Sequence, residues 1–106
     1  MISRTWHGVV PKEKGKAFLD YLKITGVKES RAIKGNMAAY VTSMDQGEYT
    51  HVFLCTLWSS RDAITAFAGK EPQIAVTYPE DAQYGLISDP IVIHQEVSSD
   101  KNPFER

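Results

Sequence analysis

The side chains best suited to chemistry in this sequence are a histidine, two tryptophans and two tyrosines. His94 lies in a run that should be a strand, Ile93-His94-Gln95. A neutral imidazole can accept a proton from an acidic phenol or an anthrone-type carbon near neutral pH. A structural histidine, bonded to a neighbouring strand or facing solvent, would give the same pattern. We therefore take His94 as a candidate general base, with the structural role as the alternative.

Two tryptophans offer flat surfaces for stacking a planar ligand, and each carries one N–H donor. Trp6 lies near the polar residues Arg4 and His7 on an otherwise apolar strand, which makes it a second catalytic candidate. Trp58 stands at the junction of a predicted strand and helix, where a core role is the commoner one. Arg4 could hold a substrate carboxylate or stabilise an enolate-like charge, or it could instead pair with Glu96.

Two tyrosines flank the segment Pro79-Glu80-Asp81. The phenols of Tyr78 and Tyr84 could bond a ligand oxygen, and the segment could act as a lid over a pocket. The acidic residues could equally cap a short helical turn. Both tyrosines are substrate-binding candidates.

Other classes of site have no signal in the chain. There is no phosphate-binding glycine loop, dinucleotide fingerprint or serine nucleophile elbow. The histidines at positions 7, 51 and 94 are not at metal-ligand spacing, and one cysteine, Cys55, builds neither a disulfide nor a thiolate site, so we expect no metal. His51 lies mid-strand with Tyr49 and Phe53 and could belong to a sheet face that binds a second copy.

Composition predicts one globular domain without nucleic-acid or membrane partners. The chain has 106 residues, 42% hydrophobic, with a net charge of -1, and its basic residues are scattered. The apolar runs are too short to span a membrane. The N-terminus lacks a hydrophobic signal region, so we expect a cytoplasmic protein.

Apolar periodicity and turn residues predict strand, helix, strand, strand, helix, strand. We expect strands at 2–10, 37–44, 49–58 and 91–97, with a hairpin loop at 45–48. The first helix follows Pro11 and is broken at Gly26, with one or two further turns over 27–32. A segment at 71–78 could add one or two helical turns. This order is typical of the α+β ferredoxin-like fold, with two helices on one face of a four-stranded antiparallel sheet, over residues 1–97. Residues 98–106 form a polar tail.

The stretch from Leu57 to Gly69 predicts the second helix in detail. Ser59 and Asp62 have the spacing of a partial capping box. An apolar stripe follows at the helical period, and Gly69 is suited to end the helix. The stripe consists of Ala63, Ile64, Phe67 and Ala68.

Both faces of the predicted sheet are apolar, although two helices can cover only one. In the third strand Tyr49 and Phe53 alternate with Val52 and Leu54, and each pair is apolar. We therefore expect the open face to bind an identical chain in a two-fold dimer, unless this face is only mildly apolar.

These segments resemble the antibiotic-biosynthesis-monooxygenase-like branch of the dimeric α+β-barrel superfamily. The resemblance rests on Arg4-Thr5-Trp6-His7-Gly8, Gly35-Asn36, Trp58-Ser59-Ser60-Arg61-Asp62-Ala63-Ile64, Phe67-Ala68-Gly69, Tyr78-Pro79-Glu80-Asp81 and His94. It implies a homodimer with a pocket between the helices and the sheet. It also implies a cofactor-independent monooxygenase that acts on a small aromatic or enolisable substrate, with Phe67 and Trp58 among the substrate-binding residues.

Two other functions are compatible with this resemblance. One is a non-catalytic dimer that binds a small hydrophobic ligand or serves a stress-related role. The other is haem binding or degradation, for which relatives use an Asn, a Trp and a His. Phe67 stands at the position of that Trp, Thr77 or Tyr78 at that of the His, and the first strand has no Asn. We therefore expect no cofactor and place haem chemistry last.

Overall fold

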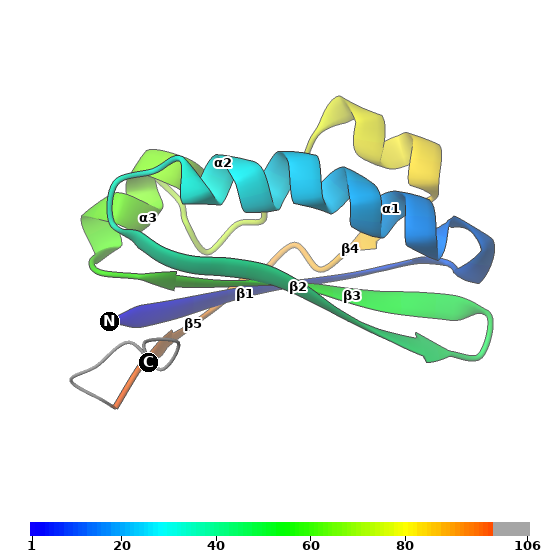
Figure 1. Cartoon of the computed structure of the whole chain (residues 1–106), viewed down its shortest axis with the longest axis horizontal. Coiled ribbons are helices and arrows are strands. Elements are labelled where there is room, and N and C mark those ends of the chain that lie inside the picture. Colours follow the sequence, from blue (N-terminus) through cyan, green and yellow to red (C-terminus); the bar gives the residue numbers. More distant parts are fainter. Residues whose placement is uncertain (99–106) are drawn as a thin grey trace.

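The computed structural model of the chain describes residues 1–98, which form an antiparallel sheet with all helices on one side (Figure 1). This confirms the predicted α+β ferredoxin-like fold. The predicted polar tail falls outside the described residues from position 99 onward. Within residues 1–98, no helix is long and apolar enough to cross a membrane.

Within residues 1–98, five strands make up the sheet. They are β1 (Ile2–Pro11), β2 (Asn36–Gln46), β3 (Tyr49–Trp58), β4 (Ile87–Ser88) and β5 (Ile93–Glu96). The order is β2-β3-β1-β4, and β5 also pairs with β1. Both short strands, β4 and β5, thus pair with β1, where the sequence predicted one continuous last strand over residues 91–97. The single strand is interrupted because Pro90 has no backbone N–H and the N–H of Val92 bonds instead to the Gln73 carbonyl at 2.8 Å.

The long helix on the sheet is built from consecutive pieces. These are the 3₁₀ turn η1 (Lys12–Lys14), α1 (Gly15–Leu22), the π-helical turn η2 (Lys23–Val27) and α2 (Lys28–Arg31). The predicted break at Gly26 is wrong, because this glycine lies inside the wide turn and the helix continues past it. A Cβ added at Gly26 would lie 2.8 Å from a Leu54 methyl carbon, so the glycine allows close packing on β3.

The second helix, α3 (Arg61–Ala68), has the predicted position. Its N-cap is Ser60, whose hydroxyl accepts from the Ala63 N–H at 3.2 Å. The cap predicted at Ser59 is therefore wrong by one residue, and the predicted capping box of Ser59 with Asp62 does not form. Gly69 ends the helix as predicted, with a φ of 85° that side chains other than glycine rarely adopt.

The segment after α3 is not helical, and the turns predicted at 71–78 are therefore wrong. Ile74 forms a β-bridge with Ile91, and the N–H of Ala75 bonds to the Pro90 carbonyl at 2.9 Å. These long-range bonds replace the local ones that a helix would use. The 3₁₀ turn η3 (Pro79–Tyr84) follows, and Asp81 caps it by accepting from the Tyr78 N–H at 2.9 Å.

The hairpin between β2 and β3 is tighter than predicted. Pairing continues to Gln46 and Tyr49, so the loop is residues 47–48 and not 45–48. Gly47, with a φ of 60°, makes this short connection possible.

Buried and more exposed residues alternate along β1, and along β3 as far as Thr56, and this alternation separates the two faces of the sheet. The helical face carries the core, whose larger members include Trp6, Phe18, Val52, Leu54 and Trp58, each at most 6% exposed. Arg4 lies on this buried face as well. His7 and its neighbours at alternate positions lie on the open face.

Candidate functional site

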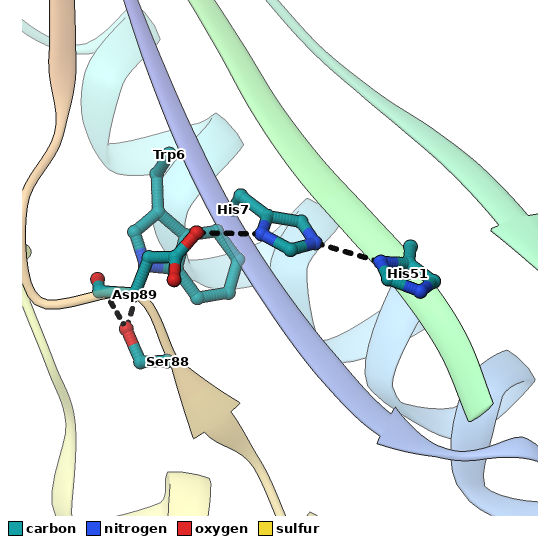
Figure 2. Close-up of polar contacts among 5 residues, drawn as sticks. All are labelled: Trp6, His7, His51, Ser88 and Asp89. Carbon is teal, nitrogen blue, oxygen red and sulfur yellow. Dashed lines mark hydrogen bonds and ion pairs between the residues drawn. The ribbon is translucent and has the colours of Figure 1, made fainter.

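Trp6 is held on the buried face of the sheet by Gly8 of β1 and by Ser88 of β4. Gly8 gives the indole room to lie along the strand, since a Cβ at Gly8 would be 2.7 Å from the ring. The indole N–H donates to the Ser88 hydroxyl at 2.8 Å, which ties β1 to the edge strand β4 (Figure 2). The tryptophan is therefore fixed in place, with its N–H already paired.

Arg4 is almost completely buried, at 2% exposure. Its Nε and Nη2 donate to the Pro72 carbonyl at 3.4 and 3.2 Å, and Nη2 also lies 3.5 Å from the Ile74 carbonyl. The guanidinium carbon is 5.5 Å from the centre of the Phe67 ring. Burial lowers the pKa of Arg4 to about 10, although Tyr78 acts in the opposite direction, so the group is charged at neutral pH.

The alternative pairing of Arg4 with Glu96 does not form. Strand register places Glu96 opposite Ile2 and places His94 opposite Arg4. Among residues 1–98, no ion pair involves Arg4. The arginine is instead bound to backbone carbonyls of the segment after α3.

A small cavity lies between the sheet and the helices. It is bounded by β1, β3, the long helix, α3 and residues 76–86, which we call the segment around η3. Its lining residues are Arg4, Trp6, Phe18, Leu22, Gly26, Leu54, Phe67, Val76, Tyr78, Asp81 and Leu86. The volume is about 20 Å³, which is room for about one water molecule. A larger ligand can enter only if part of this wall moves.

The segment around η3 forms one side of this wall and lies beside the long helix (Figure 1, yellow), against which the Tyr84 ring packs. The Tyr78 hydroxyl donates to the Glu29 carboxylate of α2, and Lys14 Nζ donates to the Gln83 carbonyl at 2.7 Å. Burial, and then the Glu29 carboxylate, raise the pKa of Tyr78 above its ordinary value. Tyr78 therefore remains a protonated donor at neutral pH.

Four of the predicted site residues line the cavity together: Arg4, Trp6, Phe67 and Tyr78. Trp58, Tyr84 and His94 lie outside its lining. Trp58 is a core residue with no exposed surface, and its N–H donates to the Thr56 hydroxyl at 2.7 Å. The Tyr84 ring packs against Phe18 and Tyr21, with centroids 5.3 and 4.9 Å apart.

His94 lies next to the cavity residue Arg4 across the β1–β5 pair. Its Nε2 is buried and has no hydrogen-bond partner among residues 1–98. Burial lowers the pKa of His94, and the positive charges of Arg4 and Arg61 lower it further. The imidazole is therefore neutral at pH 7 and can accept a proton.

A second polar arrangement lies on the open face and was missed by sequence reasoning (Figure 2). His7 Nδ1 lies 2.6 Å from an Asp89 carboxylate oxygen, and His7 Nε2 lies 2.9 Å from His51 Nδ1. When the His7 proton lies on Nδ1, facing the Asp89 carboxylate, Nε2 accepts a hydrogen bond from His51. Only the register between β1 and β3, which sets Val9 opposite His51, brings the two imidazoles together. Within residues 1–98, no group of three or more His, Cys, Asp or Glu side chains is arranged to hold a metal ion.

The open face also carries large apolar side chains from every part of the sheet. Strand register places them on one face, at exposures of 40 to 61%. They are Tyr40, Met44, Tyr49, Ile87 and Ile93, and we call them the open-face patch. The outer face of the sheet thus carries large apolar side chains, as the sequence predicted, together with polar ones such as His7 and His51.

The fold is shared with several solved structures. One, a "putative antibiotic biosynthesis monooxygenase" from Deinococcus radiodurans, has a TM-score of 0.63 and 15% identity over 99% of this chain and 100% of that one. Another of the same description, from Bacillus cereus, has a TM-score of 0.63 and 16% identity over 99% and 98%. A protein from Mycobacterium tuberculosis has a TM-score of 0.56 and 18% identity over 96% and 100%.

Neither a protein-family model nor a curated protein sequence matches the chain. The identities to the solved structures are low, so the likeness is one of fold. At the level of the fold, this likeness confirms the resemblance seen in the sequence.

Proposed function

We propose that this chain, which has the fold of the two monooxygenase-type structures, is a cofactor-independent monooxygenase for a small aromatic or enolisable substrate. The observation that carries the proposal is the cavity between sheet and helices. It combines the aromatic rings of Trp6 and Phe67 with one buried cation, Arg4. Aromatic walls suit a planar ring, and a cation stabilises the negative charge of a deprotonated substrate.

In this reaction the substrate itself reduces dioxygen. An anthrone-type CH₂ group loses a proton, and the resulting carbanion gives its electrons to dioxygen. One oxygen atom enters the product as C=O and the other leaves as water, so the four electrons lost by carbon match the four gained by dioxygen. The protein binds and orients the ring, accepts the proton and excludes water.

Two side chains are candidates for handling the proton. Neutral His94 is the proposed base, and the substrate must then extend past Arg4 toward β5, because His94 lies outside the present cavity lining. Tyr78 is better suited to donate a hydrogen bond to a substrate oxygen, since its raised pKa keeps it protonated. The segment around η3 must move away from the long helix to admit the ring.

Oxygen uptake with a panel of anthrones and hydroquinones tests this function. We expect uptake above the buffer rate for at least one compound and a loss of more than about tenfold in His94→Ala. His51→Ala, which removes a histidine of the open face, is the matched control and should keep the rate. Uptake with no compound would sink the proposal.

A non-catalytic role in binding a small hydrophobic ligand is the second candidate. It is favoured by the other walls of the cavity, which are apolar: Phe18, Leu22, Leu54, Val76 and Leu86. Binding of an aromatic compound without oxygen uptake would support this role over the enzymatic one.

We also propose that the protein is a homodimer that pairs through the open face of the sheet. The open-face patch supports this, because groups of large exposed apolar side chains on one face often mark an interface with another chain. Face-to-face packing of two sheets would bury the patch of both copies.

A further inference from the structure

The buried charge of Arg4 has no acidic partner among residues 1–98. A guanidinium taken out of water is stable when a carboxylate or several hydrogen bonds compensate for its lost hydration. Arg4 is 2% exposed, and no carboxylate of residues 1–98 forms an ion pair with it. The side chain is therefore only partly compensated.

Its bonds to the protein use one edge of the guanidinium. Nε and Nη2 face the carbonyls of Pro72 and Ile74, while Nη1 donates to none of the described residues. Arg4 lines the cavity, so we take Nη1 as the donor that a molecule inside it would meet. The structural role of Arg4 thus leaves part of its donor capacity unused.

Neighbouring charged and titratable groups do not supply the missing anion. Asp81, the acidic residue of the lining, is already engaged in capping η3 through the Tyr78 N–H. Tyr78 donates its hydroxyl to Glu29, and His94 is neutral beside Arg4. A ligand that carries an oxyanion is the group that would complete the site.

We propose that Arg4 makes this cavity selective for anionic aromatic ligands, whose carboxylate, phenolate or enolate oxygen accepts from Nη1 while the ring lies between Trp6 and Phe67. This rests on the cavity being the ligand site of the proposed function, and it names the charge of the ligand. Charge-assisted hydrogen bonds in a water-poor site are stronger than neutral ones. The deprotonated form of an enolisable substrate meets the same requirement.

The test compares two ligands of nearly the same shape, 2-naphthoate and 2-naphthamide, by isothermal titration calorimetry. We expect the full-length protein to bind the naphthoate about tenfold or more tightly than the amide. Arg4→Gln should lose this preference, and Arg4→Lys, which keeps the charge, should retain part of it. Arg31, whose guanidinium donates to the Ala39 carbonyl outside the cavity, is the matched control, and Arg31→Gln should keep the full preference.

Three results would overturn the inference: equal affinities in the unsubstituted protein, a preference that survives in folded Arg4→Gln, or binding of neither compound. The comparison of the two ligands needs no variant, so it stands even where Arg4→Gln fails to fold. Oxygen uptake is measured separately. A naphthoate preference without oxygen uptake leaves the inference standing and counts against the monooxygenase.

Discussion

At the scale of single residues, Trp6 shows how the site depends on one bond to the sheet edge. Replacing Ser88 with Ala leaves the buried indole N–H without its partner. We expect a loss of about 1 kcal/mol in the free energy of unfolding, measured by urea denaturation. Ser43→Ala, an exposed serine on β2, should change it by less than about 0.5 kcal/mol. Equal effects of the two substitutions would show that the Trp6–Ser88 bond contributes nothing.

His94 makes a prediction about pH. Its pKa in the folded chain is below the ordinary value of 6.5, so as the pH falls below about 6.5 the unfolded chain binds a proton that the folded chain resists. The folded state therefore loses stability on acidification through this group. His94→Gln removes the group, and its melting temperature should fall less between pH 7.5 and pH 5.5 than that of the unsubstituted protein. Parallel melting curves across this range would contradict the role assigned to burial and to Arg4.

The residue types of the site were predictable, but their grouping was only partly so. The period of two along β1 places Arg4 and Trp6 on the same face, and both line the cavity. His94 shares this face, yet it lies beyond Arg4 on the edge strand. The contacts between His7, His51 and Asp89 depend on strand register and on an interrupted edge strand, which a single sequence does not specify.

At the scale of elements, we expect the segment around η3 to control access to the cavity. Tyr78→Phe removes the hydroxyl that bonds to Glu29 and leaves the ring in place. We expect 2-naphthoate to bind about fivefold faster to this variant in stopped-flow fluorescence, because a net hydrogen bond of about 1 kcal/mol no longer opposes opening.

The control for this experiment is Tyr49→Phe, which removes a phenol hydroxyl at the hairpin end of β3, away from η3. Its association rate should equal that of the unsubstituted protein. An unchanged rate in Tyr78→Phe would place the entry route elsewhere in the wall.

Helices and strands that are specified by local sequence patterns were predicted well, whereas those that depend on tertiary contacts were not. Strands β1 to β3 and helix α3 follow from periodicity and from Gly69. Two elements differ from what their local sequence indicates. The helix continues through Gly26, where a break was predicted, and residues 71–78 are extended, where helical turns were predicted. In the first case close packing on Leu54 favours glycine within a helix. In the second, backbone bonds to residues 90 and 92 replace helical ones.

At the scale of the whole molecule, the open-face patch predicts the oligomeric state. We expect sedimentation to give about twice the chain mass of 11.9 kDa at micromolar concentration. A lysine in the patch, as in Ile93→Lys, buries a charge between the two sheets and should yield a monomer. Ile24→Lys, at a residue on the long helix that is 68% exposed, is the matched control and should remain dimeric. A monomer before any substitution would contradict the dimer.

The apolar outer face could be inferred from sequence because strand periodicity assigns each residue to a face. What covers that face could not, since the same pattern suits a second copy or any other apolar partner. The described structure supplies the positions of the patch residues, such as Met44 and Ile87 on opposite edges of the sheet.

The central claim, that ligands bind between the sheet and the helices, is tested most directly by nuclear Overhauser effects. The measurement uses the methyl-labelled protein and bound 2-naphthoate. We predict contacts from the aromatic protons of the ligand to the methyl groups of Leu22, Leu54 and Leu86, which line the cavity. Contacts confined to Met44, Ile87 and Ile93 would place the ligand on the open face of the sheet and contradict the claim.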